Sequence, residues 1–265
     1  MNLNNQRKEE ERSYHDLVRS DIVWEDPKLK AYYLSNGKFY SINRAQTNAV
    51  TKWWKDHLKD KVVLDYCCGD GRYALDMAPH DPKKIIGIDI SEVSVEKSKR
   101  IIAQNGLSAF CEFQVMDAEN TKFENSSFDI VNERGVLHHL DLEKAYCEIA
   151  RVLKPDGKAL CQEALIHNPL FQFYRRITPQ LRTPWEADHI LSKNKIYLAK
   201  KYFNKVEIIG FYSLMALFAV PFRNTRFFNF ILSFLEPIDH VLFKLPGFKW
   251  LAWSAVFELS QPKKD

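Results

Sequence analysis

Three acidic side chains stand at the ends of apolar runs, and their spacing is suited to holding a nucleotide. Asp65 leads into a turn that contains Gly69 and Gly71, Asp89 follows 20 positions after Gly69, and Asp117 ends a third run. A carboxylate accepts the hydroxyl hydrogens of a ribose or the amino hydrogens of an adenine. Glycines allow the backbone to turn sharply and to approach a ligand. The pattern therefore predicts a nucleotide-binding site.

A second set of residues could move a proton. His138 and His139 follow a fourth apolar run, and His15 lies in the N-terminal segment Tyr14-His15-Asp16. The pKa of an unperturbed imidazole lies near neutrality, so a histidine can act as a general base. We expect His138 or His139 to fill this role and His15 to lie on a helix that covers the site. A structural role for the His-His pair is the alternative.

These side chains can meet only if a sheet brings the ends of the runs together. Apolar runs alternate with helical patterns, and Ser91 is a suitable N-cap for a helix over 92–104 that ends at Gly106. Such alternation predicts parallel strands whose carboxyl ends share one edge, where ligands bind. The four expected strands before the histidines cover residues 62–64, 85–90, 111–115 and 128–132.

The motifs from about Lys61 to Leu165 resemble, in order, those of class I S-adenosylmethionine-dependent methyltransferases of the small-molecule type. The resemblance implies an α/β fold with a doubly wound, mostly parallel seven-stranded Rossmann-like sheet and helices on both faces. It also implies S-adenosyl-L-methionine as co-substrate and no metal. The cofactor-binding residues that it implies are Asp65, Cys67, Gly69, Gly71, Asp89, Ile90, Asp117, Ala118 and Asn132. One position departs from the family, since Cys67 stands where the first glycine of the loop is usual.

Two other functional classes remain open at this point. The spacing Gly69-x-Gly71-x-x-Ala74 also fits a dinucleotide fingerprint, which would make the protein an NAD-dependent oxidoreductase. Asp65 before the loop and Asp117 after the third strand speak against it. A catalytically silent, membrane-peripheral binding protein with the same fold is the non-enzyme alternative, and each acid taken alone could be an ordinary helix cap.

The chain divides into a helical cover at 1–60 and a methyltransferase domain at 61–265. Helical spacing covers 7–19 and 45–58, with Trp53 and Trp54 on one face. After the fifth strand we expect elements that a minimal methyltransferase lacks. They are a short helix at 170–177, a polar loop at 183–189, a helix from Ser192 to Lys201, and strands at 205–209 and 250–259, the last antiparallel by analogy with the family.

An apolar insertion at 210–246 separates those last two strands. Its longest charge-free piece, 208–222, is shorter than the roughly 20 residues that a bilayer-spanning helix needs. It either packs on the core or forms a membrane-surface or lid segment whose basic residues face lipid head groups. Both alternatives favour a small, hydrophobic or lipid-like acceptor, methylated at oxygen, carbon or nitrogen.

Composition narrows the class of protein further. A net charge of +4 with a pI near 8.6 comes from scattered basic residues, which predicts no nucleic-acid partner. The five cysteines lack disulfide or metal-ligand spacing, so we expect reduced thiols. Residues 1–20 are charged throughout and resemble neither a signal peptide nor an anchor. We expect a cytoplasmic enzyme with membrane-surface contact through 210–246.

Overall fold

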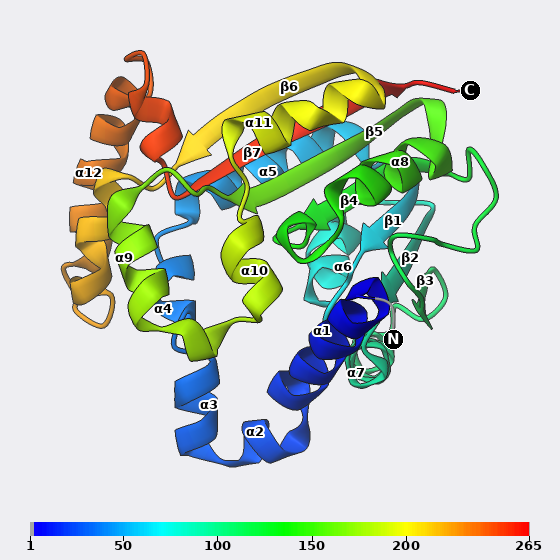
Figure 1. Ribbon diagram of the computed structural model, residues 1–265, viewed down its shortest axis with the longest axis horizontal. Helices are drawn as coiled ribbons and strands as arrows, with labels where there is room; N and C mark the ends of the chain where they lie inside the picture. The colour runs from blue at the N-terminus through cyan, green and yellow to red at the C-terminus, as the bar shows by residue number, and fades with distance from the viewer. Residues whose placement is uncertain (1–2, 265) are drawn as a thin grey trace.

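A seven-stranded sheet forms the centre of the molecule (Figure 1). The computed structural model describes residues 3–264, and within them the strand order is β3-β2-β1-β4-β5-β7-β6. Neighbouring strands are parallel except that β7 is antiparallel to both β5 and β6, which confirms the predicted mostly parallel sheet. The strands are β1 (Val62–Tyr66), β2 (Lys84–Asp89), β3 (Cys111–Val115), β4 (Phe128–Arg134), β5 (Leu153–Ala164), β6 (Phe203–Tyr212) and β7 (Ser254–Pro262).

Helices cover both faces of this sheet (Figure 1). One buried cluster joins the sheet to α8 and α11, and the other joins it to α5, α6 and α7. The helices are α1 (Leu3–Arg19), α2 (Asp21–Glu25), α3 (Pro27–Tyr33), α4 (Gly37–Tyr40), α5 (Arg44–His57), α6 (Arg72–Met77), α7 (Glu92–Gln104), α8 (Leu142–Val152), α9 (Pro169–Ile177), α10 (Pro184–His189), α11 (Lys193–Tyr197) and α12 (Phe228–Leu242).

Alternating side chains of the strands feed these two clusters. In β1, Val63 packs with α5 and α6, whereas Leu64 and Tyr66 pack with α8 on the other face. Successive side chains of a strand point to opposite faces, so a strand buried on both sides is apolar throughout. Burying each aliphatic side chain contributes about 1.5–3 kcal/mol to folding. The continuous apolar runs in the sequence follow from this double burial.

The strand order reverses beside β1, and this reversal places the site. The chain moves from β1 outward to β2 and β3, then returns to β4 on the other side of β1. Crossovers therefore leave in opposite directions at the carboxyl ends of β1 and β4, which opens a crevice there. Asp65 and Asn132 are register partners on these strands. Ser91 caps α7 as predicted, since its Oγ accepts from Ser94 N at 3.0 Å.

The N-terminal helices serve two different layers of the molecule. Helix α5 packs on the sheet, with Trp53 and Trp54 buried. Trp53 Nε1 donates to Glu258 Oε2 at 2.9 Å, and Trp54 Nε1 donates to Asn132 Oδ1 at 3.2 Å. Helix α1 instead lies over the carboxyl edge of the sheet and contacts α7 (Figure 1). Residues before 60 thus contribute both a cover and part of the core.

Two sequence predictions about the C-terminal third were wrong. The expected polar loop at 183–189 is helix α10, capped by Thr183, whose Oγ1 accepts from Glu186 N at 3.2 Å. A Thr-Pro pair supplies an N-cap and a proline at the first helical position, which is a helix start and not a loop. Strand β6 runs to Tyr212, so the insertion begins after that residue and not at 210.

The insertion is partly core and partly exposed surface, so core packing is confirmed for some of its residues, and its contact with a membrane stays a prediction. It consists of a 3₁₀ segment, Met215–Phe222, and helix α12, which pack together around Ala216, Ala219 and Leu232. Large aromatic residues stay outside this small core, as in Phe230 with 75% of its surface exposed. Among residues 3–264, no helix is both long and apolar enough to cross a bilayer.

Candidate functional site

A cavity of about 650 Å³ opens at the carboxyl edge of the sheet. Its floor is formed by the loops after β1, β2, β3 and β4 and by the end of β5, and its walls by helices α1, α4, α9 and α10. Binding sites for small molecules are commonly about 300–1,000 Å³. Six of the nine predicted cofactor residues line it, namely Cys67, Gly69, Asp89, Ile90, Asp117 and Ala118.

The other three predicted cofactor residues lie behind the loop that they support. Asn132 Nδ2 donates to Asp65 Oδ1 at 3.1 Å, and both side chains are buried between neighbouring strands. Burial raises the pKa of Asp65 to about 7. Gly71 packs on α7, where an added Cβ would stand 2.9 Å from Ser98 Cβ. These residues shape the loop from beneath and do not reach the cavity.

The loop itself has a left-handed backbone at three positions. Cys67, Gly69 and Gly71 have φ angles of 57°, 58° and 77°. Glycine adopts such angles freely, whereas a residue with a Cβ does so at a cost of about 1–2 kcal/mol. Cys67 therefore keeps the conformation that a glycine would have at this position. The departure from the family pattern changes the side chain and leaves the backbone path in place.

Asp89 joins this loop to the start of α7. Its carboxylate accepts from Gly69 N and from Ser91 N, both at 2.9 Å. Burial raises the pKa of Asp89, and the charge of Arg19 opposes the rise. A buried carboxylate tied to the glycine loop and facing the cavity suits the hydroxyl groups of a ribose.

Helix α1 closes the adenine side of the cavity through buried charges. Lys8 Nζ lies 2.6 Å from Asp117 Oδ2 and 3.0 Å from Glu119 Oε2, and Arg7 pairs with Glu119 as well. Partly buried pairs with several hydrogen bonds hold a helix more firmly than exposed pairs do. Sequence analysis missed Arg7, Lys8 and Glu119. The only signal was the basic start of a charged helix.

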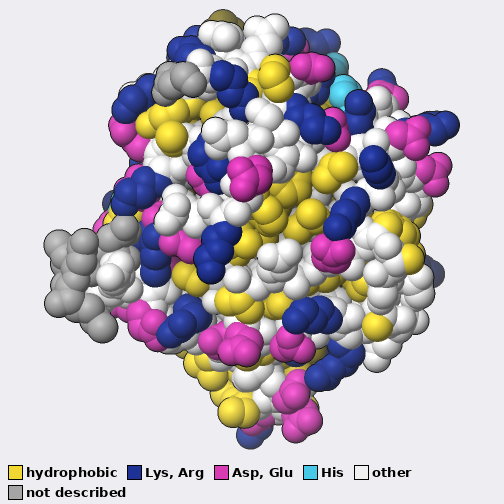
Figure 2. Space-filling model, turned by 90° about the vertical axis from the view of Figure 1, so that its right-hand side faces the viewer, with side chains coloured by type: hydrophobic (Ala, Val, Ile, Leu, Met, Phe, Trp, Pro, Cys, Tyr) yellow, Lys and Arg dark blue, Asp and Glu magenta, His cyan; other side chains and the backbone are white. Residues whose placement is uncertain are grey.

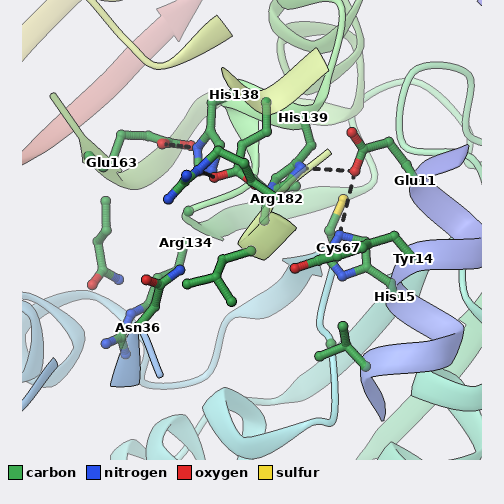
Figure 3. A pocket seen from close by; sticks show the side chains of 18 of the residues that line it. Glu11, Tyr14, His15, Asn36, Cys67, Arg134, His138, His139, Glu163 and Arg182 are labelled. Carbon is green, nitrogen blue, oxygen red and sulfur yellow. Dashed lines mark hydrogen bonds and ion pairs between the residues drawn. The ribbon is translucent and has the colours of Figure 1, made fainter. Parts of the chain in front are cut away.

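His138 and Glu163 form a buried pair on the cavity wall (Figure 3). His138 Nδ1 lies 2.6 Å from Glu163 Oε2, and Leu137 N donates to Glu163 Oε1 at 2.6 Å. Burial lowers the pKa of His138 to about 3 and raises the pKa of Glu163 to about 7, so His138 is neutral near pH 7. When Glu163 is ionised, the Nδ1–H of the neutral imidazole donates to it and Nε2 is left free to accept a proton from a ligand.

His139 and His15 meet a different carboxylate, Glu11 of α1 (Figure 3). His139 Nδ1 lies 2.9 Å from Glu11 Oε2, and His15 Nε2 lies 3.7 Å from the same oxygen. Burial lowers the pKa of His139, but the hydrogen bond to Glu11 outweighs it and the pKa is raised. Thr183 donates to the other oxygen of Glu11. His139 therefore anchors α1, which leaves His138 as the neutral ring of the pair on the cavity wall.

Glu11, His15 and His139 also have the composition of a metal site. One ligand atom from each lies within 4.8 Å of the others. Two imidazoles and a carboxylate suit a zinc-class ion. The hydrogen bonds from His139 and Thr183 already engage both oxygens of the carboxylate, so an ion is not needed to balance the group. The expectation that no metal is bound stays a prediction.

Comparisons with known proteins now identify the family. Residues 64–161 match the model of a methyltransferase domain. An uncharacterised methyltransferase of Bacillus subtilis is 38% identical over 99 residues, which cover 37% of this chain and 38% of that protein. A demethylmenaquinone methyltransferase of Symbiobacterium thermophilum is 34% identical over 116 residues, which cover 43% of this chain and 45% of that protein. Residues 64–161 therefore form a methyltransferase domain, and its relatives support the class I S-adenosylmethionine-dependent type.

The likeness in fold extends beyond the matched residues. The geranyl diphosphate C-methyltransferase of Streptomyces coelicolor, solved with S-adenosyl-L-homocysteine, superposes with a TM-score of 0.56. The two proteins share 13% identity, and the superposition covers 82% of this chain and 76% of that one. At such identity the likeness shows the shared fold. The family model covers the middle of the chain, which contains the glycine loop, and the matches to the two sequence relatives span less than half of each relative.

The opposite end of the methyltransferase cavity is aromatic. Phe39 of α4 lies edge-on to Phe171, with ring centroids 5.5 Å apart, and Phe171 stacks on Trp253 at 5.7 Å. Tyr40 and Tyr174 complete this wall. Phe39 also packs against the small core of the insertion. An aromatic wall of this kind binds flat or extended apolar groups. Sequence analysis foresaw a hydrophobic acceptor but not these residues.

Proposed function

We propose that the protein transfers the methyl group of S-adenosyl-L-methionine to a small, largely apolar acceptor. One observation carries this proposal, namely the order of groups along a single cavity. In the strand order of the sheet, Asp89 of β2 and the glycine loop after β1 come first, His138 after β4 and Glu163 of β5 follow, and Trp253 of the aromatic wall stands before β7. A relative named for demethylmenaquinone and a structural neighbour named for geranyl diphosphate are consistent with an apolar acceptor.

The chemistry requires little more than alignment and one proton acceptor. When bound, S-adenosyl-L-methionine supplies an electrophilic methyl group on a sulfonium. The acceptor's oxygen, carbon or nitrogen forms a bond to that methyl as the bond to sulfur breaks, which leaves S-adenosyl-L-homocysteine. His138 takes the proton that the acceptor loses, and Glu163 holds the imidazole in place. Fixing both reactants in one cavity supplies much of the rate.

Helix α1 contributes by excluding water. Its Tyr14 and His15 line the cavity beside the cofactor loop, and its buried ion pairs hold it there. Burial also lowers the pKa of His15 far below the usual value, so this ring stays neutral. A closed, partly dry cavity protects the reacting groups and strengthens the electrostatic interactions inside it.

Calorimetric titration with S-adenosylhomocysteine and, separately, with NADH tests this function. We expect micromolar binding of S-adenosylhomocysteine, about a hundredfold weaker in Asp89→Ala, because the loss removes two buried hydrogen bonds and the ribose contact. Asp156→Ala, at an exposed position, is the matched control. Binding of NADH alone would support the oxidoreductase alternative. Cofactor binding without turnover on any apolar acceptor would support the silent binding protein.

We also propose that the enzyme works at a membrane surface in the cytoplasm, through one face of α12. Phe230 and Phe234 are 75% and 66% exposed, and Val241 and the N-cap Phe227 lie on the same helical face. Leu232 and Leu235 on the other face pack inward. An amphipathic helix of this kind binds in the lipid interface. The free thiols of the five cysteines suit a reducing compartment.

The charges around this aromatic face favour anionic lipid. Its acidic residues are occupied, since Glu236 pairs with Arg44 at 2.5 Å and Asp239 accepts from backbone N–H groups of the 3₁₀ segment. Its exposed basic residues are Arg223, Arg226, Lys244 and Lys249. Basic residues beside aromatic rings that insert into the lipid interface attract anionic head groups. The face in Figure 2 is different, with basic and acidic side chains interspersed over most of it.

A further inference from the structure

Two arginines at the acceptor end of the cavity have no carboxylate partner. Arg134 ends β4, and its guanidinium lies 4.3 Å from the ring centroid of Tyr73. Arg175 lies on α9, and its Nη1 donates to Leu165 O at 3.2 Å. Both line the cavity. Within residues 3–264, neither forms an ion pair with an aspartate or a glutamate.

The remaining charges that face the cavity are matched or belong to its cofactor end. Lys8 pairs with Asp117, and Arg72 pairs with Asp70 at 2.9 Å. Arg182 Nε lies 3.6 Å from Glu186. The carboxyl groups of Glu11 and Glu163 are engaged by His139 and His138, and Arg7 pairs with Glu119. Arg19 lies beside Gly69 and near Asp89, so its charge belongs to the cofactor end of the cavity.

The acceptor end therefore has an excess of positive charge. Burial lowers the pKa of Arg175 to about 10, the neighbouring charge of Arg182 acts in the same direction, and the charge of Glu186, which is shared with Arg182, opposes both. A guanidinium stays charged near neutral pH even so, and a buried charge without a counter-ion is unfavourable. A ligand that brings negative charge to this end would relieve that cost.

We propose that the methyl acceptor carries an anionic group, a phosphate or a carboxylate, which binds Arg175 with Arg134 as the second cation of that end. The apolar body of the acceptor then lies against Phe39, Phe171 and Trp253. A guanidinium matches the oxygens of either anion with two parallel hydrogen bonds. This inference rests on the proposed function, since it names the class of acceptor for the same site.

Three ligands with one carbon skeleton test it, namely geranyl diphosphate, geranic acid and geraniol. Their dissociation constants are measured with the full chain saturated with S-adenosylhomocysteine. We expect at least one of the two anions to bind about tenfold more tightly than geraniol, the size of one charge-assisted hydrogen-bond pair. Whichever anion is preferred distinguishes a phosphate from a carboxylate. Arg175→Gln and Arg134→Gln should each reduce the preference to about threefold or less.

Arg176→Gln is the matched control, because Arg176 is the next residue of α9 and is exposed outside the cavity. It should leave the preference unchanged. Equal binding of the three ligands, including no binding of any, would overturn the inference. It would also fail if Arg175→Gln weakened S-adenosylhomocysteine about tenfold, because the counter-ion would then be the cofactor's own carboxylate. Failure of the wild-type protein to bind S-adenosylhomocysteine would instead count against the proposed function.

Discussion

The two ends of the cavity are built in different ways. The cofactor end comes from one continuous segment, β1 through Ala118, and its contacts are short-range hydrogen bonds to backbone, such as those of Asp89. The acceptor end is assembled from α4, the loop after β4, α9 and the start of β7, which lie far apart in the chain. A local loop can be shared across a family while the distant segments change. Specificity is therefore expected to reside in the second end.

The largest expected effect separates turnover from cofactor binding. His138→Gln removes the proposed base at the junction of the two ends, and we expect kcat to fall by about 10²–10⁴. The affinity for S-adenosylhomocysteine should stay within about twofold, because His138 makes no contact with the glycine loop. Rate assays and calorimetry on one preparation check both. His240→Gln, an exposed histidine of α12, is the control, and an equal loss there would exclude a specific role.

The second prediction concerns the pH dependence of stability at the cofactor end, where Asp65 is buried. Burial raises the pKa of Asp65 from 3.8 to about 7. The folded state therefore binds a proton more tightly than the unfolded state does, so this stability is complete below about pH 4 and is lost as pH rises through 7. Between pH 5.5 and pH 8, wild type should lose roughly 2 kcal/mol relative to Asp65→Asn.

Denaturant titrations at the two pH values measure this difference. Asp156→Asn, at an exposed position, should follow wild type at both. If Asp65→Asn also followed wild type, Asp65 would be ionised throughout and its burial would carry no such cost. The result bears on function because a strained, protonatable acid beneath the glycine loop can be stabilised by a cationic ligand.

Sequence predicted the cofactor end well because its determinants are local. The strand ends, the Ser91 cap and the loop glycines each depend on residues within a few positions. The acceptor end was predicted only as hydrophobic. The pairs that assemble the rest of the cavity join residues 25 and 172 positions apart, as in His138 with Glu163 and Glu11 with Thr183. No local pattern reports such contacts, and the Thr-Pro start of α10 was itself missed.

Substitutions in α12 should weaken membrane binding and leave cofactor binding unchanged. Phe230→Ser with Phe234→Ser removes two exposed rings, and we expect flotation with anionic vesicles to fall at least about tenfold, since each buried ring contributes on the order of 1.5–3 kcal/mol. Binding of S-adenosylhomocysteine should not change. Val115→Ser, an exposed apolar residue of β3, is the control. Unchanged flotation of the double variant would remove the membrane role from α12.

The smallest expected effect concerns the one position at which the cofactor loop departs from its family. Cys67 has a φ of 57°, so Cys67→Gly should relieve about 1–2 kcal/mol of backbone strain. The greater freedom of glycine in the unfolded chain costs about 0.5–1 kcal/mol of this stability, which leaves a net gain of roughly 0.5–1 kcal/mol.

Cys67→Ala is the control, because it loses the thiol but keeps the backbone strain. The difference between the two variants in denaturant titrations therefore isolates the backbone contribution. A glycine variant no more stable than the alanine variant would mean that the left-handed backbone at this position carries no net strain. The comparison of Cys67→Ala with wild type would then report the contribution of the thiol alone.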